Sequence, residues 1–294
     1  MKDQTTAKYV FVSLLNIVIT VAEFIGGLFA GSLALISDAF HNLGDVGAII
    51  LSFAAHLFSK KDKNRHKTFG YERSETLAAF TNGLILIMIC VFLFVEAIQR
   101  FMEPRPVHGQ IMLIVAVIGL LANLFSMLLM RSDSKKSLNV KSTFVHMLSD
   151  ALSSIAVVVS AIILNFVSLP WLDPLITMLI SLFVMKEAID VTRKAGNVLM
   201  ESNPNIDLVK VNQIMLSVPE IENVHHVHIW RYSDQVVNFD AHINVNRDLS
   251  MDDLEKIYST LDRKLRPLGI NHTTFQAEHK RGLNEKMIAP GKQD

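Results

Sequence analysis

Residues 32–67 read SLALISDAFHNLGDVGAIILSFAAHLFSKKDKNRHK. The apolar part, 33–58, is long enough to cross about 30 Å of hydrocarbon at 1.5 Å per helical residue. Asp38, His41 and Asp45 interrupt its first half, and a strongly basic stretch follows it. Ionisable groups are costly inside a bilayer, and Lys and Arg concentrate on its cytoplasmic side. The stretch therefore predicts a membrane-spanning helix that carries a functional polar site and ends in the cytoplasm.

Further apolar runs of similar length fill the first two thirds of the chain, and half of its 294 residues are hydrophobic. With the run above, they cover roughly 8–30, 33–58, 75–99, 111–130, 142–166 and 172–197. This pattern predicts an integral, multi-pass α-helical membrane protein with six transmembrane helices. We assign residues 1–202 to the transmembrane domain. The first run is longer than the apolar core of a signal peptide, so we expect no cleavable signal.

The charges of the connections orient the spans. Connections 59–74 and 131–141 are rich in Lys and Arg, whereas 31–32, 99–110 and 167–171 carry few or none. Because cytoplasmic loops hold the excess of Lys and Arg, both basic connections and both termini are expected in the cytoplasm. An even number of spans agrees with termini on the same side of the membrane.

Composition narrows the classes of function. The formal net charge is zero, which gives no indication of a nucleic-acid partner. Cys90 is the single cysteine, so the chain can form neither an internal disulfide nor a thiolate metal cluster. The sequence contains neither a GxxxxGKS/T phosphate loop nor an HExxH metalloprotease motif. We therefore expect a transporter without nucleotide drive, and not an enzyme.

The pattern His-x-x-x-Asp occurs twice inside the predicted spans. It appears as His41 and Asp45 in SDAFHNLGD, and as His146 and Asp150 in STFVHMLSD. Residues i and i+4 share one helix face, about 6 Å apart along the axis. If the two antiparallel helices face each other, two imidazoles and two carboxylates converge near the middle of the membrane. Such a set suits tetrahedral Zn²⁺, whereas Ca²⁺ and Mg²⁺ prefer more oxygens.

Other roles for these groups remain open. Buried polar residues can simply hydrogen-bond neighbouring helices, and His-Asp pairs can form a proton relay or channel without a metal. Repetition of the pattern among so few intramembrane charges favours the metal site. Glu23 and Asp38 belong to no repeat, and we interpret them as helix-packing or entry-path groups.

Residues 203–280 predict a soluble α+β domain with the element order α-β-β-α-β. Amphipathic periodicity marks helices in IDLVKVNQIMLSVP and MDDLEKIYSTLDRKLRPLG, the second with Ser250 as N-cap and Gly269 as its end. Strand patterns occur in VHHVHIWRYS, VVNFDAHINV and HTTFQAEH. Residues 281–294 are short and polar, and we expect a disordered tail.

Together these motifs resemble the cation diffusion facilitator family of metal-cation/proton antiporters. SLALISDAFHNLGDV is similar to the second-helix signature, VHMLSDALSSIAVVVSAI to its fifth-helix counterpart, and FGYERSETLAAF to a motif that follows the basic loop. The resemblance covers nearly the whole chain. It implies six spans, a C-terminal cytosolic ferredoxin-like domain, a homodimer, and export of Zn²⁺ from the cytoplasm in exchange for protons.

The resemblance also assigns residues to the transport site. His41, Asp45, His146 and Asp150 match the transport positions of the zinc, cadmium and cobalt branch. In the manganese branch, the position of His41 is typically an Asp. The basic loop has His66 as its one histidine, so we expect no further metal site there.

The cytosolic zinc ligands of the family align with His228, His242 and Glu278. Gln276 stands at a position that is often a His, and Glu255 is a candidate bridging acid. The alternative is a polar sheet edge or dimer interface whose histidines are satisfied. Members of the family form a salt bridge near the inner end of the sixth helix. The nearest equivalent in this chain is the pair of Arg73 and Glu201.

The sequence thus predicts a secondary exporter of Zn²⁺, or of Cd²⁺ or Co²⁺, of the kind that confers heavy-metal resistance. Export against 100 mV costs about 4.6 kcal/mol for a divalent ion, so an energy source is needed. Protons can supply it because they compete with metal for the same ligands. Expected partners are divalent cations, protons, the lipid bilayer and a second copy, in a bacterial cell membrane. The alternatives are a metal-independent proton relay and a Mn²⁺ or Fe²⁺ exporter of the same fold.

Overall fold

The computed structural model describes residues 2–131, 138–233, 236–246 and 249–288, with side chains except at 2–11, 13, 52, 127, 129–131, 138–147 and 149. The elements are α1 (Lys2–Ala30), α2 (Leu33–Ser59), α3 (Ser74–Met102), α4 (Gly109–Arg131), α5 (Leu138–Phe166), α6 (Leu172–Leu199), α7 (Leu208–Leu216), β1 (Ile221–Arg231), β2 (Val237–Val245), α8 (Met251–Leu265), the 3₁₀ turn η1 (Arg266–Leu268) and β3 (His272–Glu278). They form two compact units, one of Met1–Ala55 with Ala78–Arg193 and the other of His56–Leu77 with Lys194–Asp294. Each unit is described by itself.

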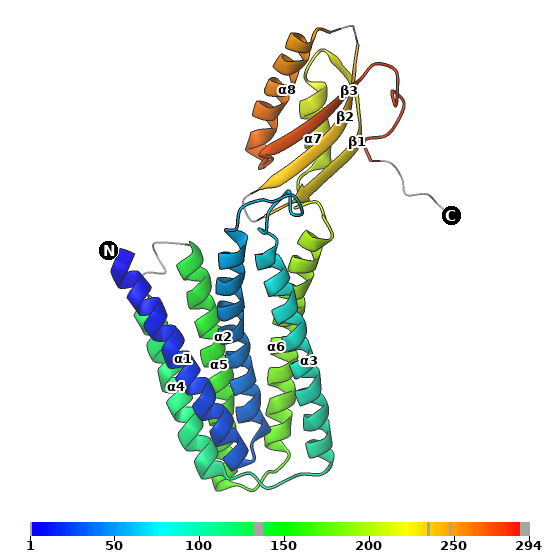
Figure 1. Ribbon diagram of the computed structural model, residues 1–294. Helices are drawn as coiled ribbons and strands as arrows, with labels where there is room; N and C mark the ends of the chain where they lie inside the picture. Colours follow the sequence, from blue (N-terminus) through cyan, green and yellow to red (C-terminus); the bar gives the residue numbers. More distant parts are fainter. Residues whose placement is uncertain (1, 132–137, 234–235, 247–248, 289–294) are drawn as a thin grey trace. The chain divides into compact units, whose positions relative to one another are not determined.

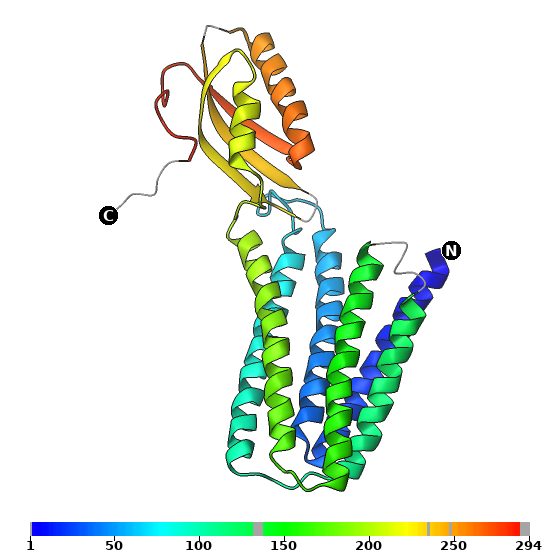
Figure 2. The ribbon, with the colours of Figure 1, turned by 180° about the vertical axis from the view of Figure 1, so that it is seen from behind.

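The first unit is a bundle of the long helices α1 to α6, which Figures 1 and 2 show from opposite sides. Each helix has 23 to 29 residues, or about 35–44 Å at 1.5 Å per residue. Its interior contains many small residues, such as Ala30, Ala34 and Ala161, which allow close helix contact. Its outer faces carry large apolar side chains, among them Phe29 and Phe92, which are 72% and 66% exposed. An apolar exterior around a partly polar interior is the arrangement that lipid requires.

By length and composition, three described helices can cross a membrane: Leu33–Ser59, Ser74–Met102 and Gly109–Ser126. Shorter apolar helices cover Leu14–Ala30 and Asp150–Phe166. In α6, the charged residues at 186, 187 and 190 shorten the uninterrupted apolar run. The structure therefore shows several apolar helices, and the count of six spans stays a prediction.

Asp173, at the start of α6, caps the N-terminus of α2. Its carboxylate accepts hydrogen bonds from Ser32 Oγ at 2.5 Å, from the Leu33 backbone N–H at 2.8 Å and from the Ala34 backbone N–H at 3.3 Å. A helix N-terminus has unsatisfied N–H groups and a positive dipole end, so a carboxylate stabilises it. Because Asp173 is fully buried, these bonds fix the end of α2 against α6.

The C-terminal unit contains a sheet with the order β1-β2-β3, in which β1 and β2 are antiparallel and β2 and β3 are parallel. Helices α7 and α8 pack on it around one apolar core that includes Phe239, Ile243 and Leu261. Ser250 caps α8 by accepting from the Asp253 N–H, and Gly269 follows η1 with a left-handed φ of 88°. The predicted α+β order, N-cap and helix end are confirmed; the ferredoxin-like assignment stays a prediction.

The chain beyond β3 folds back onto the sheet. The Val227 N–H donates to the Met287 carbonyl at 3.0 Å, and Asn223 Nδ2 donates to the Gly282 carbonyl at 3.1 Å. The prediction of a disordered tail is therefore wrong for 281–288. The polar composition of this stretch hid the fact that its backbone carbonyls satisfy donors of β1. Residues 289–294 lie outside the described part of the chain.

We predict that Asp173→Ala destabilises the protein. The change leaves the Ser32 hydroxyl and the Leu33 N–H without their acceptor, so the free energy of unfolding should fall by about 1–3 kcal/mol. Thermal unfolding in detergent, followed by circular dichroism, measures the loss. Asp173→Asn keeps one acceptor oxygen and should lose less, whereas an unchanged melting temperature in the alanine variant would contradict the capping role.

Candidate metal centres

The bundle places three of the predicted transport residues together. His41 Nε2 lies 3.1 Å from Asp150 Oδ1 and 4.0 Å from Asp45 Oδ2. One ligand atom from each residue lies within 4.8 Å of the other two. His41 and Asp150 are 3% and 4% exposed, and the side chain of Asp45 is 22% exposed. The cluster therefore lies inside the bundle, with Asp45 on its more accessible side.

His146, the fourth predicted ligand, belongs to α5, one helical turn before Asp150. Its side chain lies outside the described part of the structure. The i, i+4 spacing puts it on the same face of α5 as Asp150. Its participation in the cluster stays a prediction.

An imidazole and two carboxylates at these distances can bind a divalent cation through nitrogen and oxygen. Each group must be deprotonated to act as a ligand, so metal binding releases any proton held there. In the absence of metal, the contact between His41 and Asp150 places an imidazole nitrogen beside a carboxylate oxygen, where one proton can be shared. The geometry thus allows metal and protons to occupy the same place in turn.

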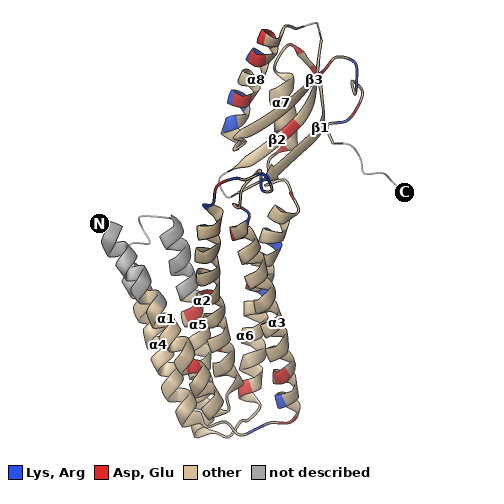
Figure 3. Ribbon diagram, in the orientation of Figure 1, with Lys and Arg blue, Asp and Glu red and all other residues tan. Residues whose placement is uncertain are grey.

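A second group of buried polar residues surrounds this cluster. Asp38 accepts hydrogen bonds from Ser153 Oγ at 2.8 Å and Ser154 Oγ at 3.0 Å, and Asn123 Nδ2 donates to Ser154 Oγ. Together these bonds connect α2, α4 and α5. Figure 3 shows how few charged residues the described parts of the long helices contain. The helix-packing interpretation of Asp38 agrees with these bonds.

The C-terminal unit contains a second cluster, made of His225, His242 and Glu278. His225 Nε2 lies 3.3 Å from Glu278 Oε2, and His242 Nδ1 lies 3.2 Å from Glu278 Oε1. The side chains of His225 and Glu278 are 2% and 5% exposed. Gln276 Nε2 donates to Glu278 Oε1 at 2.6 Å, so it orients the carboxylate. Loss of water contact lowers the pKa of His242, which favours the neutral, metal-binding imidazole.

This cluster differs from the predicted cytosolic set, because His225 takes the place given to His228. The pairing register of β1 with β2 shifts between His225 and His228, and His226 has a left-handed φ of 51°. Such a bulge lets Val224 and His225 be buried one after the other, against the strict alternation of a strand. Glu255 lies on the exposed side of α8, outside the cluster.

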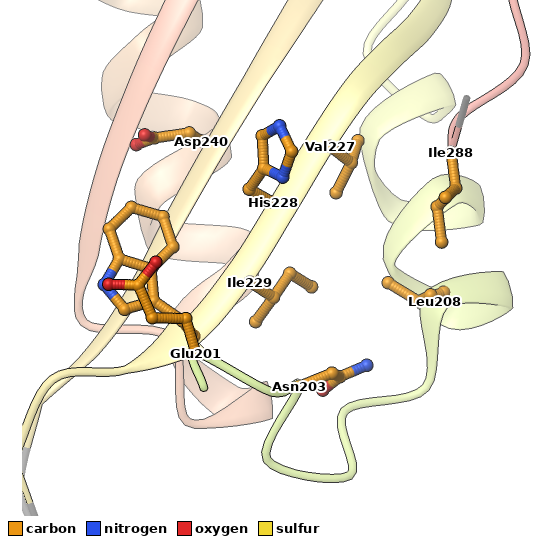
Figure 4. A pocket seen from close by; sticks show the side chains of 9 residues that line it. Glu201, Asn203, Leu208, Val227, His228, Ile229, Asp240 and Ile288 are labelled. Atoms are coloured by element: carbon orange, nitrogen blue, oxygen red, sulfur yellow. The ribbon is translucent and has the colours of Figure 1, made fainter. Parts of the chain in front are cut away.

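His228 instead lines a groove of about 490 Å³ in the same unit. Figure 4 shows it on β1 with Val227 and Ile229, with Asp240 on β2 nearby, and Glu201 is among the other residues that line the groove. The ring of His226 lies 4.8 Å from that of His228 and 4.6 Å from that of His242, between centroids. The exposed rings of His226 and His228 thus lie next to the buried cluster, to which His242 belongs.

The salt bridge expected between Arg73 and Glu201 is present. Arg73 NH2 donates to Glu201 Oε1 at 2.9 Å, and the Arg73 guanidinium lies 5.9 Å from the centroid of the Tyr232 ring. Tyr232 in turn contacts Phe69, with ring centroids 5.1 Å apart. These contacts connect the basic segment 60–73 to the end of α6 and to the sheet.

Comparison with known proteins finds a family match for the helical bundle and another for the C-terminal unit. The family model of the cation efflux transmembrane domain matches residues 10–200, and that of the cation efflux protein cytoplasmic domain matches residues 203–280. The chain therefore belongs to the cation efflux family, the cation diffusion facilitators, which is a family of transporters and not of enzymes.

Among its curated relatives is the zinc transporter ZitB of Pectobacterium atrosepticum, 39% identical over 89% of this chain and 82% of the relative. A cadmium, cobalt and zinc/H(+)-K(+) antiporter of Bacillus subtilis is 35% identical over 88% of this chain and 84% of the relative. The metal cation efflux system protein CzcD of Cupriavidus metallidurans is also 35% identical, over 88% of this chain and 82% of the relative.

We predict that His225, and not His228, is required for zinc binding by the C-terminal unit. The test uses the full chain with Asp45→Ala and Asp150→Ala, so that the bundle no longer contributes. Zinc at about 100 times its dissociation constant should stabilise this protein by about 2.7 kcal/mol, and His225→Gln should abolish the rise in melting temperature. His228→Gln is the matched control and should keep it. The reverse pattern would return His228 to the ligand set.

Proposed function

We propose that this protein is a six-span membrane antiporter that exports Zn²⁺ from the cytoplasm in exchange for protons. The observation that carries this proposal is the cluster of His41, Asp45 and Asp150 inside an apolar bundle. Two carboxylates and an imidazole in such surroundings are costly unless a cation or protons neutralise them. Relatives named as zinc transporters and as a cadmium, cobalt and zinc antiporter support a divalent metal as the cargo.

With His146 as the fourth ligand, the site is a tetrahedral set of two imidazoles and two carboxylates, which suits Zn²⁺ and also Cd²⁺ and Co²⁺. Imidazoles argue against Mn²⁺, which prefers oxygen ligands. A Mn²⁺ or Fe²⁺ exporter of the same fold is the alternative cargo assignment.

Exchange for protons follows from the ligand chemistry. Metal binds from the neutral cytoplasm to deprotonated groups, the helices rearrange around the site, and protons from the far side displace the metal. The proton gradient then supplies the free energy of export. The relative from Bacillus subtilis is named a cadmium, cobalt and zinc/H(+)-K(+) antiporter, and this name supports exchange for protons.

The proposed transporter has two domains and a defined orientation in the membrane. Residues 1–202 form the transmembrane domain, and residues 203–280 form a cytosolic domain that binds zinc through His225, His242 and Glu278 and joins two copies into a homodimer. Both termini lie in the cytoplasm, because the connections 59–74 and 131–141 are basic. The membrane is that of a bacterium, an assignment supported by the bacterial origin of the relatives named above. Zinc bound in the cytosolic domain stabilises the dimer and reports the cytosolic zinc concentration.

We expect Asp45→Ala and Asp150→Ala each to abolish zinc uptake into proteoliposomes under an imposed proton gradient. Each change removes a ligand, and loss of one charged ligand from a buried site should weaken metal binding by at least about tenfold, or 1.4 kcal/mol. A zinc-sensitive dye inside the vesicles and a pH-sensitive dye measure both fluxes.

Asp190→Ala, which removes an exposed carboxylate of α6, is the matched control and should transport like the wild type. Zinc flux that persists in both cluster variants would move the metal path elsewhere. Proton flux that is independent of zinc would favour the metal-independent proton relay. Faster transport of Mn²⁺ than of Zn²⁺ would favour a Mn²⁺ or Fe²⁺ exporter of the same fold.

A further inference from the structure

Glu23, in the last third of α1, is a buried carboxylate, and one of its oxygens has no hydrogen-bond partner among the described residues. Its side chain is 1% exposed, and its Oε2 accepts a hydrogen bond from Asn42 Nδ2 at 2.8 Å. Among the described residues, no group hydrogen-bonds to its Oε1, which is packed against Gly119 of α4. Asp38 differs, because both of its oxygens accept hydrogen bonds from serine hydroxyls.

The helices next to Glu23 contain few cationic residues. No Lys or Arg occurs in 9–59, 109–130 or 142–166, which cover most of α1, α2, α4 and α5. Among the described residues, Asp38 and His41 of α2 and Asp150 of α5 interact electrostatically with Glu23, while α4 presents Gly119.

Charge balance in these helices is unfavourable without bound cations. They hold the carboxyl groups of Glu23, Asp38, Asp45 and Asp150. A divalent metal on the cluster cancels the charges of Asp45 and Asp150 when its histidines are neutral, so the negative charge near Glu23 is greatest when the metal is absent. A buried negative charge without a cationic partner is neutralised by a proton. Glu23 Oε1, which has no hydrogen-bond partner among the described residues, can hold that proton when the metal is absent.

We propose that Glu23 is a proton-binding group of the transporter, separate from the metal ligands, whose carboxyl is protonated when the metal leaves and is deprotonated when the metal binds. This proposal rests on the metal–proton exchange proposed above. Oε1 carries the proton, while Oε2 keeps its hydrogen bond from Asn42. One proton is bound or released in each cycle, and no other bond changes.

Electrostatic linkage couples the two events. Metal on His41, Asp45 and Asp150 adds positive charge near Glu23 and weakens its hold on a proton. By reciprocity, a proton on Glu23 weakens metal binding by the same factor. In a water-poor interior this coupling is stronger than it would be at the surface. Glu23 thus links the proton gradient to the cargo without occupying the coordination sphere.

Glu23→Gln tests this, because the amide keeps the size and the bond to Asn42 but cannot titrate. In proteoliposomes, zinc-for-zinc exchange at equal pH should stay within about twofold of the wild type, while accumulation driven by a proton gradient should fall by at least about tenfold. The plot of log Kd for zinc against pH, which falls as pH rises, should become less steep by about one log unit of Kd per pH unit. Glu96→Gln is the matched control, because Glu96 is paired with Arg100 on α3, and all three measurements should be unchanged.

Gradient-driven accumulation at the wild-type level with an unchanged pH slope would overturn the proposal, and so would loss of zinc-for-zinc exchange, which would place Glu23 in the metal path. Failure of the proposed function itself looks different: the wild type would not accumulate zinc, or Asp45→Ala would still do so. If Glu23→Gln does not fold, Glu23→Asp carries the test. Zinc binding should then remove a protonated-carboxyl infrared band whose frequency differs from that of the wild type, and an unshifted band would refute the assignment.

Discussion

The cost of a charge in an apolar, water-poor interior governs the arrangement of this protein. A carboxylate that loses water must find a cation, a proton or several hydrogen-bond donors. Each buried acid of the bundle meets this demand differently. Asp173 uses the N–H groups of a helix end, Asp38 uses two serine hydroxyls, and Asp150 contacts the imidazole of His41. Polar residues thus determine which helices must lie side by side, while the apolar faces are free to contact lipid.

The C-terminal unit follows the usual pattern of a small α+β domain, in which helices and a sheet enclose an apolar core. Here the buried pair of His225 and Glu278 is the exception, and a distortion of β1 makes it possible. The left-handed residue at the bulge is His226, which tolerates that conformation better than a β-branched residue would. The chain after β3 then covers the site, with Gly282 placed directly against the His225 ring, where a larger residue would collide.

Much of this arrangement was predictable from local patterns. The i, i+4 repeat identified His41, Asp45 and Asp150, since helix periodicity alone places them, and alternation identified the strands. His225 was not predictable, because ideal alternation along VHHVH groups His226 with His228 and gives no sign of a bulge. The cap by Asp173 was missed because its partners lie about 140 residues away in sequence. Long-range hydrogen bonds of this kind leave no periodic signal.

The bond network at Asp173 also determines how α2 can move. A helix fixed at one end turns about that end, so displacement grows with distance from the pivot. At 1.5 Å per residue, His41 lies about 12 Å from Leu33, and Ser59 about 39 Å. A tilt of about 10° would therefore move His41 by about 2 Å but Ser59 by about 7 Å. Such a tilt would move the basic end of the helix about three times as far as His41, so a large displacement at that end needs only a small one at this metal ligand.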